Sequence, residues 1–531
     1  MLTFFVIAPI FLAVLLYLLP FTNAKKYLVI LAQSALLVAA IHLFYRAQGG
    51  EIITNIGNYT GYMGIILRAD SLSAVFVILT TLIFLVVSIY CFNESNSKLF
   101  WFLFFIWEGA FIGLFLTRDL FNIFVLAEVS SAVAAVLLMY KRSSRSGYHG
   151  IVYLMVNVIV MQLYLFGVGY LYMLAGALDM EYASRVIQTT LEPSQLVLPY
   201  ALIMTAIAAK CSLMPLFIFL PKVQALPRAP VSVAALMSGL QAKSGLYLFL
   251  RFRDIFEGVH VGEVFLVIGV ITAVGGILLA LAQTDVKLLL AYSTVAQMGL
   301  IVVGLSLDGA YAHVGSLYHI ISHAISKSAL FLGTGIVIRV YNTRDINHIH
   351  GLLRRMPLLG VCLLASILAI TGVPFFSGNI SKYFMMAEAG SVLNGIMTLI
   401  NMGTILVFIK YARILFEKPE GGEDWTVRVD VFKQAALVIL ATLGLIGGIW
   451  GTRIMQLLFG AEVTIDTAGY IQKIVILAAS WGVGLLLYRQ RRHAGAALRA
   501  VTDHLELGFR AITVSVGAFL AALLIVVGWL A

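Results

Sequence analysis

Charged residues are scarce in this chain of 531 residues: Asp, Glu, Lys and Arg together make up 11% of it, against about 25% in a typical soluble domain. The three cysteines, Cys91, Cys211 and Cys362, stand apart from one another, without a CxxC pair or a ligand-like cluster. This excludes iron–sulfur, haem and structural zinc sites built on cysteine. We also expect no strands, and therefore no Gly-rich phosphate loop of the kind that follows a strand. No stretch is long and polar enough to form a soluble domain.

Apolar residues are abundant instead. They make up 61% of the chain, and the mean hydropathy is +1.00. Runs of about 20 apolar residues, each long enough to cross about 30 Å of hydrocarbon, predict an all-α polytopic membrane protein with about sixteen transmembrane helices. The first run lacks a basic n-region and a cleavage site, so we interpret it as a helix rather than a signal peptide. The predicted spans are 3–20, 27–45, 71–91, 99–117, 119–140, 150–176, 197–220, 230–250, 263–283, 286–306, 312–340, 358–387, 392–416, 433–458, 469–487 and 511–530.

Basic residues concentrate in alternate loops, and the net charge is +10. Loops after odd-numbered spans hold about 21 Lys and Arg, and loops after even-numbered spans hold about 8, which is the asymmetry that the positive-inside rule uses. With an even number of spans, the rule places the basic loops in the cytoplasm and both termini on the extracytoplasmic side of the membrane. The alternative is a chance asymmetry of charge.

Five ionisable residues interrupt the apolar runs: Glu128, Lys210, Lys243, Lys327 and Lys382. An ionised side chain at the bilayer centre costs about 2.5–3.5 kcal/mol on insertion scales. Such residues on separate helices require partners, water or a function that offsets this cost. We interpret them as a path for small cations, above all protons, along the membrane interior.

One predicted span carries a potential proton relay. His319, His323 and Lys327 follow one another at intervals of four residues, so they share one face of a helix. Histidine titrates near neutral pH, and a desolvated lysine has a lowered proton affinity. Two alternatives remain: core histidines beside a snorkelling lysine, or a metal bound by the two histidines, for which a third ligand is missing nearby.

Two further groups extend this path. Glu128 and Lys210 are expected at similar depth, where pairing would lower the cost of burying both, and opening of the pair would release the lysine's proton toward Lys243. Small residues and glycine flank Lys243, and such residues allow helix irregularity and close approach of water or backbone. Lys410 can snorkel to the membrane surface and is left out of the path. Candidate accessory residues are Glu108, Glu388 and Asp285.

Two spans contain proline beside an intramembrane lysine. Pro215 follows Lys210, and Pro374 precedes Lys382. Proline removes a backbone donor and clashes with the preceding turn, so both helices are predicted to break there. Broken helices at corresponding positions of two halves are typical of transport sites; ordinary proline kinks are the alternative.

The chain divides by its spans into four parts: residues 1–98, a first repeat 99–252, a second repeat 262–416, and a C-terminal part 417–531. The charged loop 417–430 is a candidate docking surface for a partner. Residues 489–510 place apolar side chains among charges and predict a short amphipathic helix at the membrane interface.

Several of these motifs resemble antiporter-like subunits of respiratory complex I, of Mrp-type cation/proton antiporters and of energy-converting hydrogenases. The resemblance covers roughly residues 60–415, where the motifs occur in the same order. Among these groups, the chain resembles the Mrp D-type subunits most. The motifs are Leu120–Phe124 leading to Glu128, Ala229–Ser232 with Ser238, Gly239 and Lys243, Gln283–Lys287 through Ala291–Ser293 to Gln297–Gly299, His319–Lys327, and Gly372–Pro374 leading to Ser381 and Lys382.

The resemblance implies two inverted five-helix repeats, spans 4–8 and 9–13, with spans 7 and 12 broken, inside a core of fourteen helices to which two are added. It implies a proton path through Glu128, Lys210, Lys243, the two histidines and Lys382. It also implies other membrane subunits as partners, which hold the redox cofactors in those complexes that have a redox module, and no cofactor in this chain. The segment Pro215–Pro221 and Gln224 depart from the family, which commonly has histidines there.

The leading functional hypothesis is a proton-translocating subunit of a multi-subunit ion-pumping complex. A sodium/proton antiporter subunit and a bicarbonate-uptake subunit of the same fold are alternatives, although a lysine-rich path favours protons over Na⁺, which prefers oxygen ligands. A purely structural membrane subunit is a further alternative. No nucleophile–base pair or metal set supports an enzyme with its own catalytic site, and no nucleic-acid partner is expected.

Overall fold

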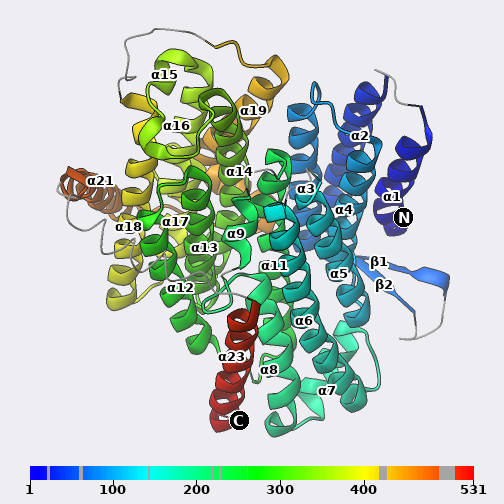
Figure 1. The fold of residues 1–531 in the computed structure, drawn as a ribbon. Coiled ribbons are helices and arrows are strands. Elements are labelled where there is room, and N and C mark those ends of the chain that lie inside the picture. Colours follow the sequence, from blue (N-terminus) through cyan, green and yellow to red (C-terminus); the bar gives the residue numbers. More distant parts are fainter. Residues whose placement is uncertain are drawn as a thin grey trace.

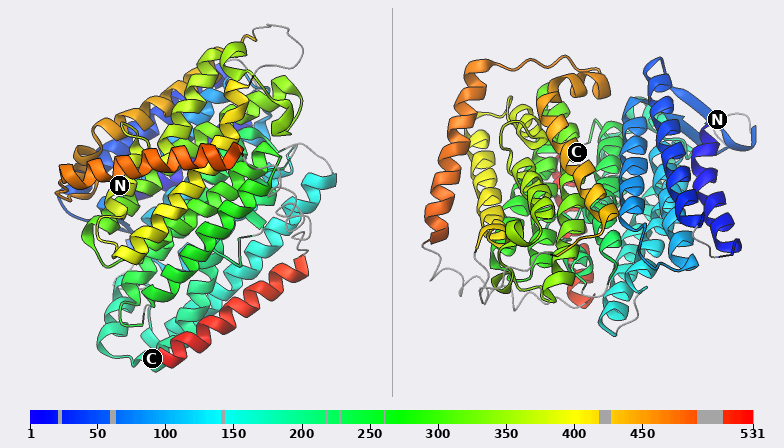
Figure 2. Two further views of the ribbon diagram at one scale, coloured as in Figure 1. Left: turned by 90° about the vertical axis from the view of Figure 1, so that its left-hand side faces the viewer. Right: turned by 90° about the horizontal axis from the view of Figure 1, so that it is seen from above.

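The computed structural model describes residues 1–20, 24–58, 64–140, 144–217, 219–226, 229–259, 261–417, 427–489 and 509–530. In these ranges the chain forms a bundle of long helices that run side by side (Figures 1 and 2). Among them, 13 helices are long and apolar enough to cross a membrane. The predicted all-α polytopic membrane protein is therefore confirmed, whereas the count of sixteen spans stays a prediction.

The first part of the bundle contains α1 (Leu2–Leu18), α2 (Ala24–Gln48), strands β1 (Ile52–Asn55) and β2 (Ile66–Ala69), α3 (Ser71–Tyr90), α4 (Lys98–Leu116), α5 (Leu120–Leu138), α6 (Ser144–Ala175), α7 (Met180–Thr189), α8 (Pro193–Lys210), α9 (Phe219–Gln224), α10 (Val231–Leu236) and α11 (Ala242–Ile255). A short 3-10 helix (Ile56–Asn58) follows β1, and a π-helical segment (Met237–Gln241) joins α10 to α11.

The second part contains α12 (Gly262–Ala282), α13 (Val286–Leu305), α14 (Ala310–Tyr341), a 3-10 helix (Ile346–His348), α15 (Leu352–Arg355), α16 (Pro357–Thr371), α17 (Ser377–Met385), α18 (Ser391–Phe416), α19 (Val431–Ile449), α20 (Gly451–Phe459), α21 (Thr467–Arg489) and α23 (Phe509–Leu530). Most of loop 417–430 and of segment 489–510 lies outside the described residues, so the docking surface and the amphipathic helix stay predictions.

Both predicted helix breaks are present. Span 7 divides after Lys210, where α8 ends, and helix resumes at α9. Span 12 divides into α16 and α17, with Gly372 at the C-cap of α16 in the left-handed conformation, at φ 84°, a backbone geometry that glycine adopts without steric cost. Part of the polar backbone at each break is hydrogen-bonded within the protein, as between the Leu213 amide and the Ala208 carbonyl and between the Val373 amide and the Leu368 carbonyl, which is what irregular backbone at membrane depth requires.

The prediction of no strands is wrong in one place. Strands β1 and β2 form a short antiparallel hairpin with Ile52 opposite Ala69. Leu67 also pairs with Thr117, the residue that follows α4. Alternation over four residues is too short a signal to stand out between two long apolar helices.

Ion pairs join the hairpin to the end of the bundle. Asp70 accepts hydrogen bonds from Arg68 at 2.8 Å and from Arg251 of α11 at 2.7 Å. Burial alone raises the pKa of this carboxyl, but the two guanidinium groups and the Ser73 amide hold it below its usual range. Asp70 therefore stays ionised and caps α3.

Both chain termini lie at the end of the bundle that carries the hairpin. Arg46, at the end of α2, donates a hydrogen bond to the sulfur of Met1. Near the C-terminus, Gly528 approaches Val197 in the first turns of α8, with 3.8 Å between the Cβ position of the glycine and a side-chain carbon of the valine. Both termini lie at the same end because the chain crosses the bundle an even number of times.

The two halves of the core share a backbone arrangement. Helices α6 and α14 each have 32 residues, and each is followed by a segment that bonds back to the residues before α5 or α13. The bonds are Leu120 N–H to Leu178 O and Met180 N–H to Arg118 O in the first half, and Val286 N–H to Arg344 O and Ile346 N–H to Thr284 O in the second. This supports the predicted repeats.

Candidate functional site

The site begins where α8 ends. Lys210 is buried, and its ammonium donates to Ser131 Oγ of α5 at 2.7 Å and to Asn157 Oδ1 of α6 at 3.0 Å. Glu128 lies one turn before Ser131 on α5. Within the described chain, no ion pair joins Glu128 to Lys210, because the serine and the asparagine occupy the ammonium. The expected pairing is thus not direct, and the proposed switch between the two residues stays a prediction.

Glu108 lies deeper, on α4. It is fully buried and accepts a hydrogen bond of 2.5 Å from Gln33 of α2. The neighbouring Trp107 donates its indole N–H to Ser130 Oγ at 3.1 Å and to Gln241 Oε1 at 3.3 Å. Ser130 itself donates to Gln241 at 3.0 Å. These bonds connect α4 and α5 to the π-helical segment that leads to Lys243.

The helix that carries Lys243 is irregular, as the small residues around it allow. The π-helical segment ends just before it, and its ammonium donates to the backbone carbonyl of Ser238 inside that segment. A π-helical turn displaces carbonyls from the α-helical ladder and recurs at functional sites. The Ser238 hydroxyl meets Thr294 Oγ1 of α13 at 3.0 Å, so this segment contacts the second half of the protein.

Helix α14 holds the three predicted relay residues in its buried middle. His319 and His323 are 1% exposed and Lys327 is 0% exposed, and the two imidazole centroids are 6.3 Å apart. Lys327 donates to the Leu290 carbonyl at 2.9 Å and to Ser293 Oγ. The three residues share one face, as the spacing predicted.

His319 bridges two neighbouring helices. Its Nδ1 lies 2.8 Å from Ser381 Oγ of α17, and its Nε2 lies 3.0 Å from Gln297 Oε1 of α13. Both ring nitrogens are thus occupied, which leaves none for a metal shared with His323. Neither nitrogen of His323 has a partner among the described residues, and such buried groups are normally satisfied by ordered water.

Lys382 lies past the break in span 12. Its ammonium donates to the Ile370 carbonyl of α16 at 2.7 Å and to Asn401 Oδ1 of α18 at 2.7 Å. The Ile370 carbonyl is open to this bond because α16 ends one residue later. A cavity of about 170 Å³ lies beside Lys382, lined also by Asn379, Asn394, Asn401, Tyr470 and Lys473.

Two of the three accessory candidates have positions that favour a structural role. Asp285 caps α13 through the amides of Lys287 and Leu288 and pairs with Arg344 at 2.6 Å. Glu388 accepts a hydrogen bond from the Ala312 amide at the start of α14 rather than lining the cavity beside Lys382. Both carboxylates thus neutralise helix N-termini.

Sequence reasoning missed the uncharged side chains that contact the ionisable ones. They are Ser131 and Asn157 at Lys210, Gln297 at His319, and Asn401 at Lys382. Polar uncharged residues in apolar helices are a weak signal, because many only bond to their own backbone. Gln224, at the position that departs from the family, is buried with no partner for either amide atom among the described residues.

Known proteins share both the sequence pattern and the fold of this chain. Residues 117–409 match the model of a family described as NADH:quinone oxidoreductase/Mrp antiporter, transmembrane. The chain belongs to this antiporter family. The matched region contains all seven residues of the predicted path, from Glu128 to Lys382.

A curated relative and two solved structures are similar to this chain, the relative in sequence and the structures in fold. The chain is 29% identical over 442 residues to a Na⁺/H⁺ antiporter subunit, of the D type, from Alkalihalophilus pseudofirmus, a match that covers 81% of this chain and 89% of the relative. It has the fold of a chain in the Mrp complex of Dietzia sp. DQ12-45-1b, with a TM-score of 0.81 at 22% identity over 90% of this chain and 99% of that one. A chain of respiratory complex I from Thermus thermophilus gives 0.76 at 21% identity, over 90% and 99%.

Proposed function

We propose that this chain is the proton-translocating, antiporter-like subunit of a multi-subunit ion-pumping complex in a prokaryotic cytoplasmic membrane. The observation that supports this most is the series of ionisable groups from the half-buried Glu128 to the buried Lys382, each lysine and His319 held by neutral polar groups of neighbouring helices or of the backbone. Buried charges at this depth are retained where they carry ions. Both solved structures above are complexes, which supports other membrane subunits as partners.

The proposed mechanism depends on repulsion between like charges. Lys243, Lys327 and Lys382 form no ion pair with an acidic side chain of the described chain, so each positive charge is offset by neutral groups: carbonyl and hydroxyl oxygens and, for Lys327, the ring of Phe408. In a poorly polarisable interior, two neighbouring ammonium groups repel strongly. A proton that arrives on Lys243 therefore favours loss of a proton further along, through His323 and His319, toward Lys382.

The cavity beside Lys382 is the proposed outlet. Tyr470 and Lys473, in the first two turns of α21, form part of its wall, and the charge distribution of the loops places this end of α21 on the extracytoplasmic side. A proton released by Lys382 thus reaches polar groups that lead out of the membrane on that side.

Sodium is the second candidate cargo, because the relative in A. pseudofirmus is named a Na⁺/H⁺ antiporter subunit. The deciding measurement is proton flux in proteoliposomes that contain the assembled complex, with and without Na⁺. Flux that is equal in both conditions supports a proton pathway. Flux that requires Na⁺ on the opposite side supports exchange, and a complex that moves neither ion contradicts the proposal.

Glu128→Gln tests the first step of the pathway. Glutamine keeps the shape but cannot titrate, so we expect proton flux to fall by about tenfold or more, since a positioned proton-transfer group contributes at least that much. The matched control is Glu257→Gln, at an exposed position after α11, which should leave flux unchanged. Normal flux in the Glu128 variant would rule out a switch at this residue.

A further inference from the structure

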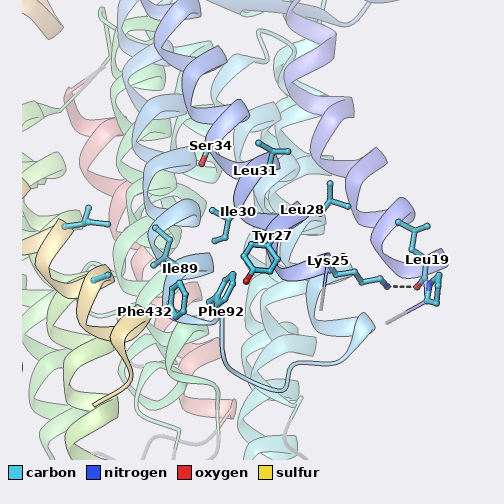
Figure 3. Close-up of a pocket in the computed structure, with 14 residues that line it drawn as sticks. Leu19, Lys25, Tyr27, Leu28, Ile30, Leu31, Ser34, Ile89, Phe92 and Phe432 are labelled. Carbon is cyan, nitrogen blue, oxygen red and sulfur yellow. Dashed lines mark hydrogen bonds between the residues drawn. The ribbon is translucent and has the colours of Figure 1, made fainter. Parts of the chain in front are cut away.

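An apolar groove of about 1030 Å³ opens on the outside of the bundle between the ends of α1, α2, α3 and α19 (Figure 3). None of the seven pathway residues lines it, so it takes no part in the function proposed above. Aliphatic and aromatic side chains form its walls, among them Leu28, Leu31, Ile89, Phe92, Phe432 and Ile439. Phe92 and Phe432 stack at one end with their centroids 4.0 Å apart.

The groove has the depth of one membrane leaflet. Its lining residues on α2 run from Ala24 to Ser34, and at 1.5 Å per residue this corresponds to about 15 Å. That is half of the roughly 30 Å hydrocarbon core. A helix of a partner subunit would cross both leaflets and would require a longer groove, whereas an acyl chain occupies one leaflet only.

Cationic side chains lie beside the mouth of the groove. Lys25, Lys26, Lys98 and Trp101 line a small neighbouring pocket. Lys25 is directed to the Leu19 carbonyl (Figure 3), so it caps α1. Neither Lys26 nor Lys98 forms an ion pair with an acidic side chain within the described ranges, and both are partly exposed.

We propose that this groove binds an anionic phospholipid, with its phosphate between Lys26 and Lys98 and an acyl chain along α2. The lysines follow spans 1 and 3, on the side that the loop charges assign to the cytoplasm, where the leaflet is anionic. Tyr27, which lines the groove and is 67% exposed, is an amphipathic ring of the kind that meets lipid headgroups. Charge and groove depth thus select the same ligand.

The test measures lipid that remains bound to the full chain. The protein is reconstituted with equal amounts of dioleoyl phosphatidylglycerol and dioleoyl phosphatidylcholine, extracted in mild detergent and analysed by native mass spectrometry. We expect preferential retention of phosphatidylglycerol, and a loss of about tenfold in the double variant Lys26→Ala/Lys98→Ala, because each lysine near an anionic surface contributes to binding. Leu31→Trp, at a side chain that is 68% exposed in the groove, should lower retention of the lipid by filling its place.

The matched control removes two other basic residues from the same side of the membrane. Arg354→Ala/Arg428→Ala changes the net charge equally at exposed positions that line neither the groove nor the neighbouring lysine pocket, and it should retain phosphatidylglycerol as the unaltered chain does. Equal retention of both lipids by the unaltered chain would overturn the proposal. Unchanged retention in the Lys26/Lys98 variant would do so as well, as would unchanged retention in Leu31→Trp.

Discussion

Proton flux through the assembled complex is expected to fall on the order of 100-fold when Lys327 is replaced by alanine, which is the lower end of what a positioned proton-transfer group contributes. Lys327 is fully buried and follows His323 by one helical turn. Its removal leaves no titratable group at the centre of α14 beyond the histidines. Flux is measured in proteoliposomes with a pH-sensitive dye.

Two further variants separate transport from structure. Lys327→Met retains the volume of the side chain, so it should lose flux equally while the complex assembles. Lys410→Ala removes a partly buried lysine that donates to the Leu281 carbonyl at the end of α12, outside the pathway, and should retain most of the flux. If Lys327→Ala and Lys210→Ala both assembled and pumped normally, the chain would be a structural subunit.

Gly378→Ala is expected to destabilise the protein by about 3 kcal/mol or more, because a side chain there overlaps backbone that cannot move cheaply. A Cβ atom at this position would lie 1.9 Å from the Ala369 carbonyl oxygen, where α17 approaches α16 across the break. The variant should lose assembled complex and unfold at lower temperature in detergent, as followed by size-exclusion chromatography after heating.

Gly395→Ala is the matched control, also in a membrane helix. No atom lies within 4 Å of the Cβ position there, so alanine should stabilise α18 by about 0.5–1 kcal/mol through its greater helix propensity. A Gly378 variant as stable as this control would contradict the close packing of the two half-helices.

Much of the architecture can be predicted from the sequence of each helix taken alone. The long apolar runs predict the helices of the bundle, because membrane insertion depends on the local composition of each segment. Pro215 and Pro374 predict both breaks for the same reason, since proline acts on its own turn. The relay face of His319, His323 and Lys327 follows from helical periodicity alone.

Contacts between helices cannot be predicted from the sequence of one helix. Whether Lys210 meets Glu128 or meets Ser131 and Asn157 depends on the rotation of α5 about its axis, which the residues of α5 alone do not fix. The capping roles of Asp285 and Glu388 likewise depend on which helix end lies beside each carboxylate. These residues look alike in a hydropathy profile, because the profile reports burial and not partners.

The sequence by itself determined that the chain spans a membrane, that its helices break beside two lysines, and that ionisable side chains lie at membrane depth. Only the tertiary structure decided which uncharged residues contact those side chains, and that a one-leaflet groove forms where α2, α3 and α19 meet. The physical reason is that burial and periodicity are properties of one segment, whereas a hydrogen bond or a groove requires two segments to be placed against each other.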